Sequence, residues 1–333
     1  MSVVSNDRLK ITSPAGVAAA LPALVGFKPK ESIVAVFLKE DRVIVCMRAD
    51  IPDLWDEVAV QLEVVADRVD ADALILTICC ARGKGDLPFQ DEVTLVLKDL
   101  ASTRIVVNAA MLVDGAQYWP FDLQSKSVAS DACNDEGVFL DLETSGLGTD
   151  GFAASREDVC ARYAFRQELQ PTEDLVAQAS QSMSDDPKEI ASVAWESVCI
   201  LAGRNGIEHE GFDLERLRAI LMVAVTHVHV RDYVMGRIAT DTTPVPLVEV
   251  VVETALRAPL DLRPKIAGMA AALLAAFNPS TVPASCLVEL AGSDSLADLV
   301  RRSIGGAMPP TEIRDLLARC LPQASAQLEG VHE

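Results

Sequence analysis

The chain has 333 residues, half of them hydrophobic but only 5% aromatic, and its 29 basic and 49 acidic residues give a formal net charge of −20. Its length exceeds the size at which one hydrophobic core keeps growing, so we expect two domains or one domain with a large extension. The acidic balance excludes nucleic acid and anionic membranes as direct partners, because both need patches of lysine and arginine that neutralise phosphates.

The first predicted element is a helix over residues 13–26. Ser13 suits the N-cap, Pro14 suits the first helical position, and Gly26 suits the position after the helix end. Pro22 falls inside this segment, removes a backbone hydrogen bond and clashes with the preceding turn. We therefore expect the helix to be kinked or divided near residue 21.

The next segments alternate between strand and helix. The β-branched runs 32–38 and 42–52 predict a hairpin. Both strands are too apolar for either to have a solvent-exposed face. Helical spacing of apolar residues over 54–69 and a short apolar run over 71–80 follow, and residues 88–121 repeat the alternation. The N-terminal half is therefore predicted to be α/β with a mixed sheet covered on both faces.

Beyond residue 121 the pattern changes from alternation to helices alone. Residues 122–154 are rich in Ser, Asp and Gly and show no sustained period, which indicates a loop or a boundary. Helical candidates separated by Pro and Gly then cover 155–168, 172–182, 187–203, 213–239, 245–256, 263–277, 283–291, 294–305 and 310–320. We predict an α/β domain over 1–121, an irregular linker over 122–154, an all-α domain of short helical hairpins over 155–322, and a tail over 323–333.

Two histidines, His227 and His229, stand close together beside an Arg-Asp pair in the predicted helix 213–239. Two residues apart on a helix, they point about 200° apart around its axis. Helical metal binding needs a spacing of four, as in HExxH, so we predict no metal site. Arg231 and Asp232 are adjacent and should not share a helical face. We expect each to pair elsewhere, as a structural or interface residue.

Catalytic motifs are not apparent in the sequence. The loop 79–92 places two glycines around Lys84 between a strand and a helix, but it matches neither the Walker nor the dinucleotide pattern, which favours a solvated loop. There is no GxSxG elbow, and all four histidines lie outside the α/β half. We therefore predict no catalytic residue and no cofactor.

The cysteines and the N-terminus indicate a reducing compartment. The eight cysteines form no CxxC pair, and most should be reduced, buried thiols. The first residues lack the basic and apolar regions of a secretory signal, and the longest apolar or glycine run, 266–277, is too short to span a bilayer. We expect a cytoplasmic protein that does not enter the membrane.

Seven stretches, taken in chain order, carry a family resemblance. They are PALVGFKPKESIVAVFL at 22–38, MRADIP at 47–52, LVDGAQYWPF at 112–121, CNDEG at 133–137, SREDVCAR at 155–162, VRD at 230–232 and SLADLVRRSIGGAMPP at 295–310. Together they resemble an actinobacterial family named domain of unknown function 4192. The resemblance implies a cytoplasmic protein of actinobacterial or phage-borne origin and carries no known activity. The chain departs from the family pattern at His227 and His229, and CNDEG has one cysteine where a pair is frequent.

Two functional hypotheses follow. The first is a non-catalytic cytosolic protein-interaction or regulatory protein, whose alanine-rich helical half binds a protein partner or a second copy of the chain. The alternative is a small-molecule enzyme or ligand sensor with its site at the rim of the N-terminal sheet. Ser32, Arg48, Asp50 and Trp119 stand there at strand ends or turns, where the crevice residues of α/β sheets gather. Arg156 is a further candidate for a ligand-binding residue.

Overall fold

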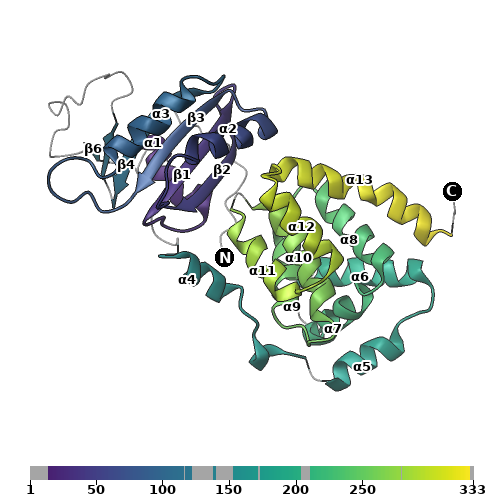
Figure 1. The fold of residues 1–333 in the computed structure, drawn as a ribbon. Helices are drawn as coiled ribbons and strands as arrows, with labels where there is room; N and C mark the ends of the chain where they lie inside the picture. Colours follow the sequence, from purple (N-terminus) through teal and green to yellow (C-terminus); the bar gives the residue numbers. More distant parts are fainter. Residues whose placement is uncertain are drawn as a thin grey trace. The chain divides into compact units, whose positions relative to one another are not determined.

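The computed structural model describes residues 14–115, 117–121, 138–139, 153–171, 173–203, 211–278 and 280–330. The chain divides into two compact units, Met1–Val159 and Cys160–Glu333. Figure 1 shows a sheet with helices in the first unit and helices alone in the second. The predicted fold class, an α/β half with a mixed sheet followed by an all-α half, is confirmed. The predicted linker 122–154 lies mostly outside the described residues, so the predicted domain boundaries stay predictions.

The first unit, which we call the α/β unit, is built on a six-stranded sheet with the order β2-β1-β3-β4-β5-β6. Its strands are β1 (Ser32–Lys39), β2 (Arg42–Asp50), β3 (Ala73–Cys79), β4 (Val106–Asp114), β5 (Gln117–Pro120) and β6 (Val138–Phe139). Strands β3 and β4 are parallel and all other neighbours are antiparallel, so the sheet is mixed. The β1–β2 turn uses Glu40 and Asp41 with φ of 49° and 60°, as the turn of a tight hairpin requires.

Strand β2 is less covered than predicted. Strand β1 is buried at every residue except the last, because it has a hydrogen-bonded neighbour on each side. Strand β2 lies at the edge of the sheet, and its residues are half-buried or exposed. The expectation of a covered strand is therefore right for β1 and wrong for β2, since an apolar sequence does not reveal which strand of a hairpin will lie at an edge.

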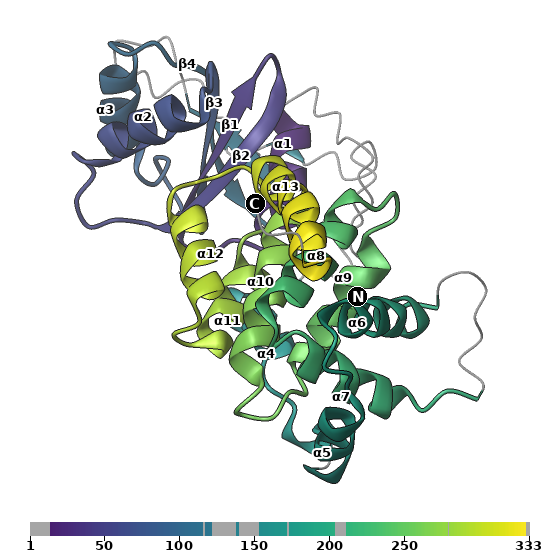
Figure 2. The same ribbon diagram turned by 90° about the vertical axis from the view of Figure 1, so that its right-hand side faces the viewer.

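Helices cover both faces of this sheet (Figure 2). Helices α2 (Val58–Val69) and α3 (Gln90–Leu100) lie on one face, over a core that includes Phe37, Leu76 and Leu112. Helix α1 (Pro14–Val25) lies on the other face.

Helix α1 is continuous through Pro22, so of the two expected outcomes near residue 21, a kink or a division, the division is wrong. Pro22 stands in the last turn of the helix, and Gly26, at φ 91°, donates its N–H to the Pro22 carbonyl over 2.8 Å. Nearly all described side chains of α1 are buried, from Val17 to Val25. This burial offsets the cost of about 3 kcal/mol that a proline imposes inside a helix. Ser13, the predicted N-cap, lies outside the described residues.

The second unit, which we call the helical unit, is organised around one buried helix. The helices that the structure describes from residue 156 onward are α4 (Arg156–Arg162), a short 3-10 helix (Gln167–Leu169), α5 (Glu173–Ser182), α6 (Pro187–Leu201), α7 (Leu214–Ala224), α8 (Val228–Thr240), α9 (Val245–Ala255), α10 (Arg263–Phe277), α11 (Val282–Ala291), α12 (Ser295–Gly305) and α13 (Pro310–Leu328). Helix α10 is buried from Ile266 to Ala276 and packs against α9, α11, α12 and α13. Its many alanines allow these helices to approach closely. Within the described residues, no helix is both long and apolar enough to cross a bilayer.

The single helix predicted over 213–239 is wrong, because the chain breaks between α7 and α8. Thr226 donates its hydroxyl to the carbonyl of Val223 over 2.7 Å, which satisfies an end of α7. His227 then adopts an extended backbone, with φ −78° and ψ 113°, as the N-cap residue of α8. Thr hydroxyls compete with helix continuation in this way. The helical spacing of apolar residues continues from α7 into α8, because both helices bury one face in the same unit.

Candidate functional site

The candidate site lies at the edge of the sheet where β3 and β4 end, and we call this edge the sheet rim. The two strands are parallel, so their carboxyl ends, Cys79 and Asp114, meet there. Antiparallel pairing brings the start of β1 and the end of β2 to the same edge, because Ser32 pairs with both Asp50 and Cys79. Ligands of open α/β sheets bind outside the carboxyl ends of the strands.

Arg48 is held at the sheet rim by polar and aromatic neighbours. Its Nε donates a hydrogen bond to Ser32 Oγ over 2.9 Å, and its Nη2 lies 2.6 Å from Asp50 Oδ1. The guanidinium carbon lies 5.9 Å from the centre of the Phe27 ring, within cation–π range. Ser32 is fully buried and donates its hydroxyl hydrogen to the Lys30 carbonyl. The structure thus brings three predicted candidates, Ser32, Arg48 and Asp50, into one cluster.

Trp119 does not belong to this cluster. It pairs with Leu112 and lies in the core beneath α2 and α3, together with Ile33. Arg48 pairs with Val34, the next residue along β1. Because successive side chains of a strand point to opposite faces, Trp119 and Arg48 lie on opposite faces of the sheet.

Trp119 has a charged neighbour, Arg82, that was missed in the sequence. The guanidinium carbon of Arg82 lies 5.8 Å from the centre of the Trp119 ring. The backbone N–H of Arg82 donates to Asp114 Oδ2 over 2.9 Å, and its Nη1 donates to the Asp86 carbonyl over 3.1 Å. Arg82 is only 8% exposed, whereas the loop residues after it, from Gly83 to Asp86, are exposed. The solvated loop predicted over 79–92 is therefore wrong at Arg82, whose place three residues after the end of a buried strand was the available signal.

Two buried donors in this pair have no acceptor. The Nε of Arg82 and the indole Nε1 of Trp119 make no hydrogen bond with any residue that the structure describes. A buried donor without an acceptor costs about 1–3 kcal/mol. This face of the sheet rim therefore holds two buried N–H donors, one of them on a cation, that have no acceptor among the described residues.

The nucleophile chemistry of the sheet rim is weak. Burial raises the pKa of the Cys79 thiol to about 12 and that of the Cys80 thiol to about 11, so both are protonated at neutral pH. The Ser32 hydroxyl donates to a carbonyl and accepts from Arg48, so its hydrogen bonds are used in positioning. The described rim groups are therefore poorly suited to nucleophilic attack.

The two histidines lie at the start of α8. His227 is the N-cap residue of α8, and His229 lies in the first turn of that helix; both are exposed. Within the described part of the chain, no group of three or more His, Cys, Asp or Glu residues is placed to hold a metal ion. His209 and His332 lie outside the described residues.

Arg231 and Asp232 pair with each other, which overturns the expectation that adjacent helical residues cannot meet. Arg231 is 7% exposed, and its Nε and Nη2 donate to Asp232 Oδ1 over 3.1 and 3.0 Å. The long arginine side chain bends around the helix to reach its neighbour. Arg156, the remaining candidate, is exposed in the first turn of α4 and makes no hydrogen bond or ion pair with a described residue.

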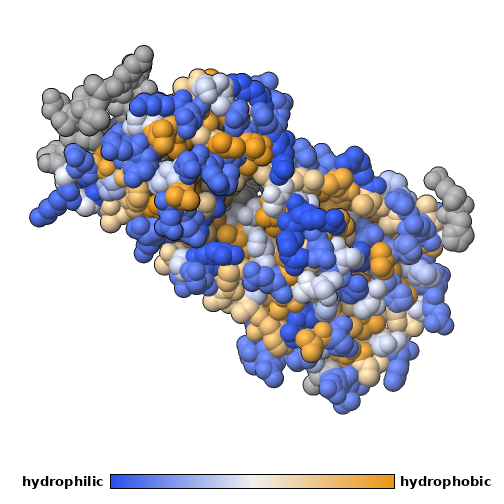
Figure 3. All heavy atoms as spheres, in the orientation of Figure 1, coloured by the Kyte–Doolittle hydropathy of each residue, from blue (hydrophilic) through white to orange (hydrophobic). Residues whose placement is uncertain are grey.

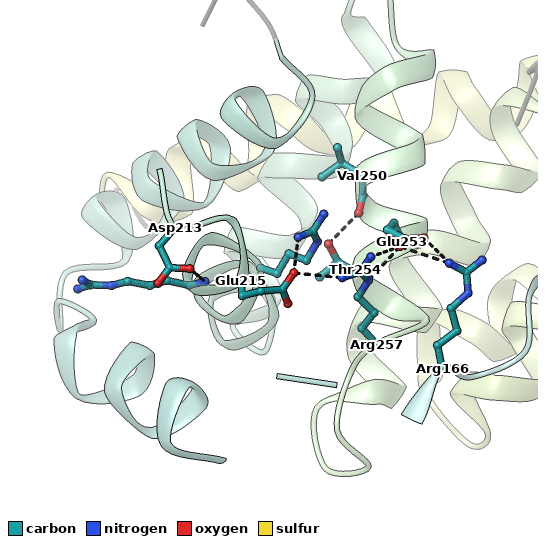
Figure 4. A network of polar contacts seen from close by, with 9 residues as sticks. Arg166, Asp213, Glu215, Val250, Glu253, Thr254 and Arg257 are labelled. Carbon is teal, nitrogen blue, oxygen red and sulfur yellow. Dashed lines mark hydrogen bonds and ion pairs between the residues drawn. The ribbon is translucent and has the colours of Figure 1, made fainter. Parts of the chain in front are cut away.

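A network of charged side chains links three segments of the helical unit (Figure 4). Glu215 of α7 accepts from Arg218 Nη1 over 2.7 Å and from Arg257 Nη1 over 3.1 Å. Glu253 of α9 accepts from Arg257 Nε over 2.9 Å and from Arg166 Nη1 over 3.2 Å. Each carboxylate therefore bridges two guanidinium groups, and the network ties the segment before the 3-10 helix to α7 and α9.

Comparison with known proteins gives one match. The model of a family described as "Domain of unknown function (DUF4192)" matches residues 14–311, from the start of α1 into α13. The search of curated proteins found no match, and neither did the search of solved structures.

Proposed function

The chain belongs to the DUF4192 family, and we propose that it is a non-catalytic, cytoplasmic protein-interaction or regulatory protein whose helical unit binds a protein partner or a second copy of the chain. The family membership agrees with the resemblance found in the sequence. The cytoplasmic location and the actinobacterial origin belong to the same proposal and rest on composition and on that resemblance.

The observation that carries this proposal is that charged side chains of the helical unit form ion pairs between its helices. Its well-positioned charged side chains stabilise the packing of helices, as in the charged network of Figure 4 and in the pair of Lys265 Nζ with Asp294 Oδ2 at 2.8 Å. Asp294 has no exposed side-chain surface and caps α12 through the N–H groups of Leu296 and Ala297. These contacts favour a rigid scaffold, which suits a surface that recognises a partner.

Apolar side chains lie exposed on this scaffold. Leu260, Leu299 and Leu316 are 75%, 53% and 42% exposed, on the loop after α9, on α12 and on α13. On the face shown in Figure 3, hydrophobic residues form small groups among hydrophilic ones. Isolated apolar residues are common on protein surfaces, so a binding role for them needs a direct test.

Size-exclusion chromatography with light scattering tests the proposal. We expect a mass near twice the 35.6 kDa of one chain, or one stoichiometric partner in a pull-down. Leu316→Asp should weaken that association, because it places a charge on an exposed apolar position of α13. Thr311→Asp, also exposed on α13, is the matched control. A monomer at all concentrations that captures no stoichiometric partner would overturn the proposal.

A second candidate function, a small-molecule enzyme or ligand sensor, is favoured by the two donors, at Arg82 and Trp119, that have no acceptor among the described residues. Arg48 and Arg82 place a cation on each face of one sheet rim in a chain of net charge −20. Such a rim would attract a small carboxylate or phosphate ligand. The acceptor oxygens of that ligand would satisfy the buried N–H groups.

Thermal shift against inorganic phosphate, dicarboxylates and nucleotides tests this second function. A ligand at 100 times its Kd should add about 2.7 kcal/mol of stability. The thermal shift should be measured in Arg48→Met and in Arg82→Met, because each variant removes the guanidinium group from a different face of the sheet rim. Lys84→Met, at an exposed position of the same loop as Arg82, is the matched control. A shift that only Lys84→Met removes would contradict this function, as would no shift with any ligand class.

A further inference from the structure

Two cysteine sulfurs meet inside the helical unit. Cys160 of α4 and Cys286 of α11 are 126 residues apart in the chain, yet their Sγ atoms lie 2.7 Å apart. That distance is longer than the disulfide bond of about 2.05 Å and shorter than ordinary non-bonded contacts of about 3.5–4.0 Å between heavy atoms. The two side chains therefore converge on each other, as the formation of a disulfide requires.

The segment that carries Cys160 is held against the helices on which Cys286 packs. Arg166 donates its backbone N–H to the Leu256 carbonyl over 2.8 Å. The guanidinium carbon of Arg263 lies 3.6 Å from the centre of the Phe165 ring. Together with the Arg166–Glu253 ion pair of Figure 4, these contacts fix the chain after α4 on α9 and α10. Helix α10 in turn packs on α11, so the meeting of the thiols rests on several independent contacts.

The two thiols differ in how well a reagent can reach them. Cys286 is 8% exposed, whereas Cys160 is half-buried. Tyr163 is buried beside them, and burial, with a smaller effect of Cys286, raises the pKa of its hydroxyl to about 12. An oxidant in solution therefore reaches Cys160 first and leaves Cys286 to react from inside.

We propose that Cys160 and Cys286 form a redox modification site that is oxidised to a disulfide by a low-molecular-weight disulfide. The Cys160 thiolate attacks one sulfur of the reagent, forms a mixed disulfide and releases one molecule of the small thiol. Cys286 then attacks the Cys160 sulfur and releases the second molecule. The two cysteines together lose two protons and two electrons, and the reagent is reduced to two thiols.

The bond would act on the segment that joins the two units. Helix α4 spans the division between them, which falls between Val159 and Cys160. A disulfide to α11 would fasten the end of this helix to the helical unit by a covalent bond in addition to the contacts of Phe165 and Arg166. Oxidation would therefore limit the opening of residues 160–171. This inference does not depend on the proposed function.

Peptide mapping of the full-length protein tests the proposal. The reduced protein is exchanged into oxidised glutathione, blocked with an alkylating agent and digested with trypsin. Cys160 falls in the peptide 157–162 and Cys286 falls in the peptide 266–301, and each peptide contains no second cysteine. We expect these two peptides to be linked, the link to vanish in dithiothreitol, and trypsin to cut the native oxidised protein at Arg162 and Arg166 more slowly than the reduced protein.

Two variants keep the test specific. Cys160→Ser should abolish both the link and the protection from trypsin, while Cys320→Ser, which removes an exposed cysteine of α13, should retain both. A Cys160 that stops at the mixed disulfide with glutathione would overturn the proposal. So would links spread evenly among other cysteine pairs, or unreacted Cys160 in a sample whose Cys320 has reacted.

Discussion

At the scale of single residues, three arginines of the helical unit that are largely buried each pair with an acidic residue close to them in the chain. Arg231 pairs with the next residue, Arg218 with Glu215 three residues before it, and Arg257 with Glu253 four residues before it. Spacings of three and four are those of neighbours on a helix surface. The Arg231 pair shows that a long side chain can also reach an adjacent residue.

Arg231→Ala should destabilise the helical unit strongly. The change leaves Asp232, whose side chain is 29% exposed, without the guanidinium group that now neutralises it, and it opens space where a side chain was 92% buried. Breaking such a pair from one side costs roughly 3 kcal/mol. Arg319→Ala, at an exposed position of α13, should cost under about 1 kcal/mol. Denaturant melts of both variants measure the difference, and equal costs would contradict the structural role of Arg231.

The Cys79 and Cys80 thiols predict a loss of stability at alkaline pH. Burial raises their pKa from 9.0 to about 12 and about 11, so the unfolded chain releases these protons at a lower pH than the folded chain. Their contribution to stability is complete below pH 9 and is lost as pH rises toward the folded-state values. The unfolding free energy should fall more steeply between pH 9 and 11 in the natural chain than in the Cys79→Ala/Cys80→Ala variant. If the unfolding free energy of the two proteins falls by the same amount between pH 9 and 11, this assignment is wrong.

At the scale of elements, close helix packing decides where small residues are needed. Gly236 of α8 lies against α13, and a Cβ atom placed there would come within 2.7 Å of Leu321 Cβ and 3.1 Å of Leu321 Cα. The second distance is to the backbone, so a side-chain rotation does not relieve the clash. Helices α8 and α13 therefore cross closely at a glycine.

Gly236→Ala should consequently destabilise the helical unit by about 1–3 kcal/mol, the usual cost of overpacking. Gly305→Ala, at the end of α12, is the matched control, because an added Cβ there meets nothing within 4 Å and the backbone φ is not left-handed. It should leave stability unchanged or raise it by up to about 1 kcal/mol. Thermal melts of the two variants test the crossing, which would be contradicted by a neutral Gly236→Ala.

At the scale of the whole molecule, the chain consists of two units with separate cores. The core of the α/β unit lies between the sheet and its helices, and the core of the helical unit surrounds α10. Separate cores favour separate cooperative transitions.

We expect calorimetry of the full chain to resolve two unfolding transitions. Gly236→Ala should lower the Tm of one of them, and Leu76→Ala, which opens a cavity in the fully buried centre of the α/β unit, should lower the Tm of the other. A single transition that both variants lower equally would show that the units unfold together.

The sequence determined the class of the fold and most of its elements. The helix predicted over 263–277 coincides with α10, and the alternation over 32–121 became the mixed sheet, because apolar periodicity and proline and glycine signals act locally. Tertiary structure decided the rest: the exposure of β2, the continuity of α1 through Pro22 and the break at His227. Each depends on which surface packs against which, and periodicity does not specify that.

The residues of the candidate site also fall into those that the sequence predicts and those that only the folded structure reveals. Ser32, Arg48 and Asp50 could be predicted because strand ends are visible in the sequence and parallel strands share an edge. Trp119 lies on the opposite face of the sheet from these three residues, which the sequence does not reveal, since the face on which a side chain lies depends on strand register. Arg82, Cys160 and Cys286 acquire their partners through pairings between residues 32 to 126 positions apart. Only the folded chain brings such residues together, because no local pattern records a contact over that distance.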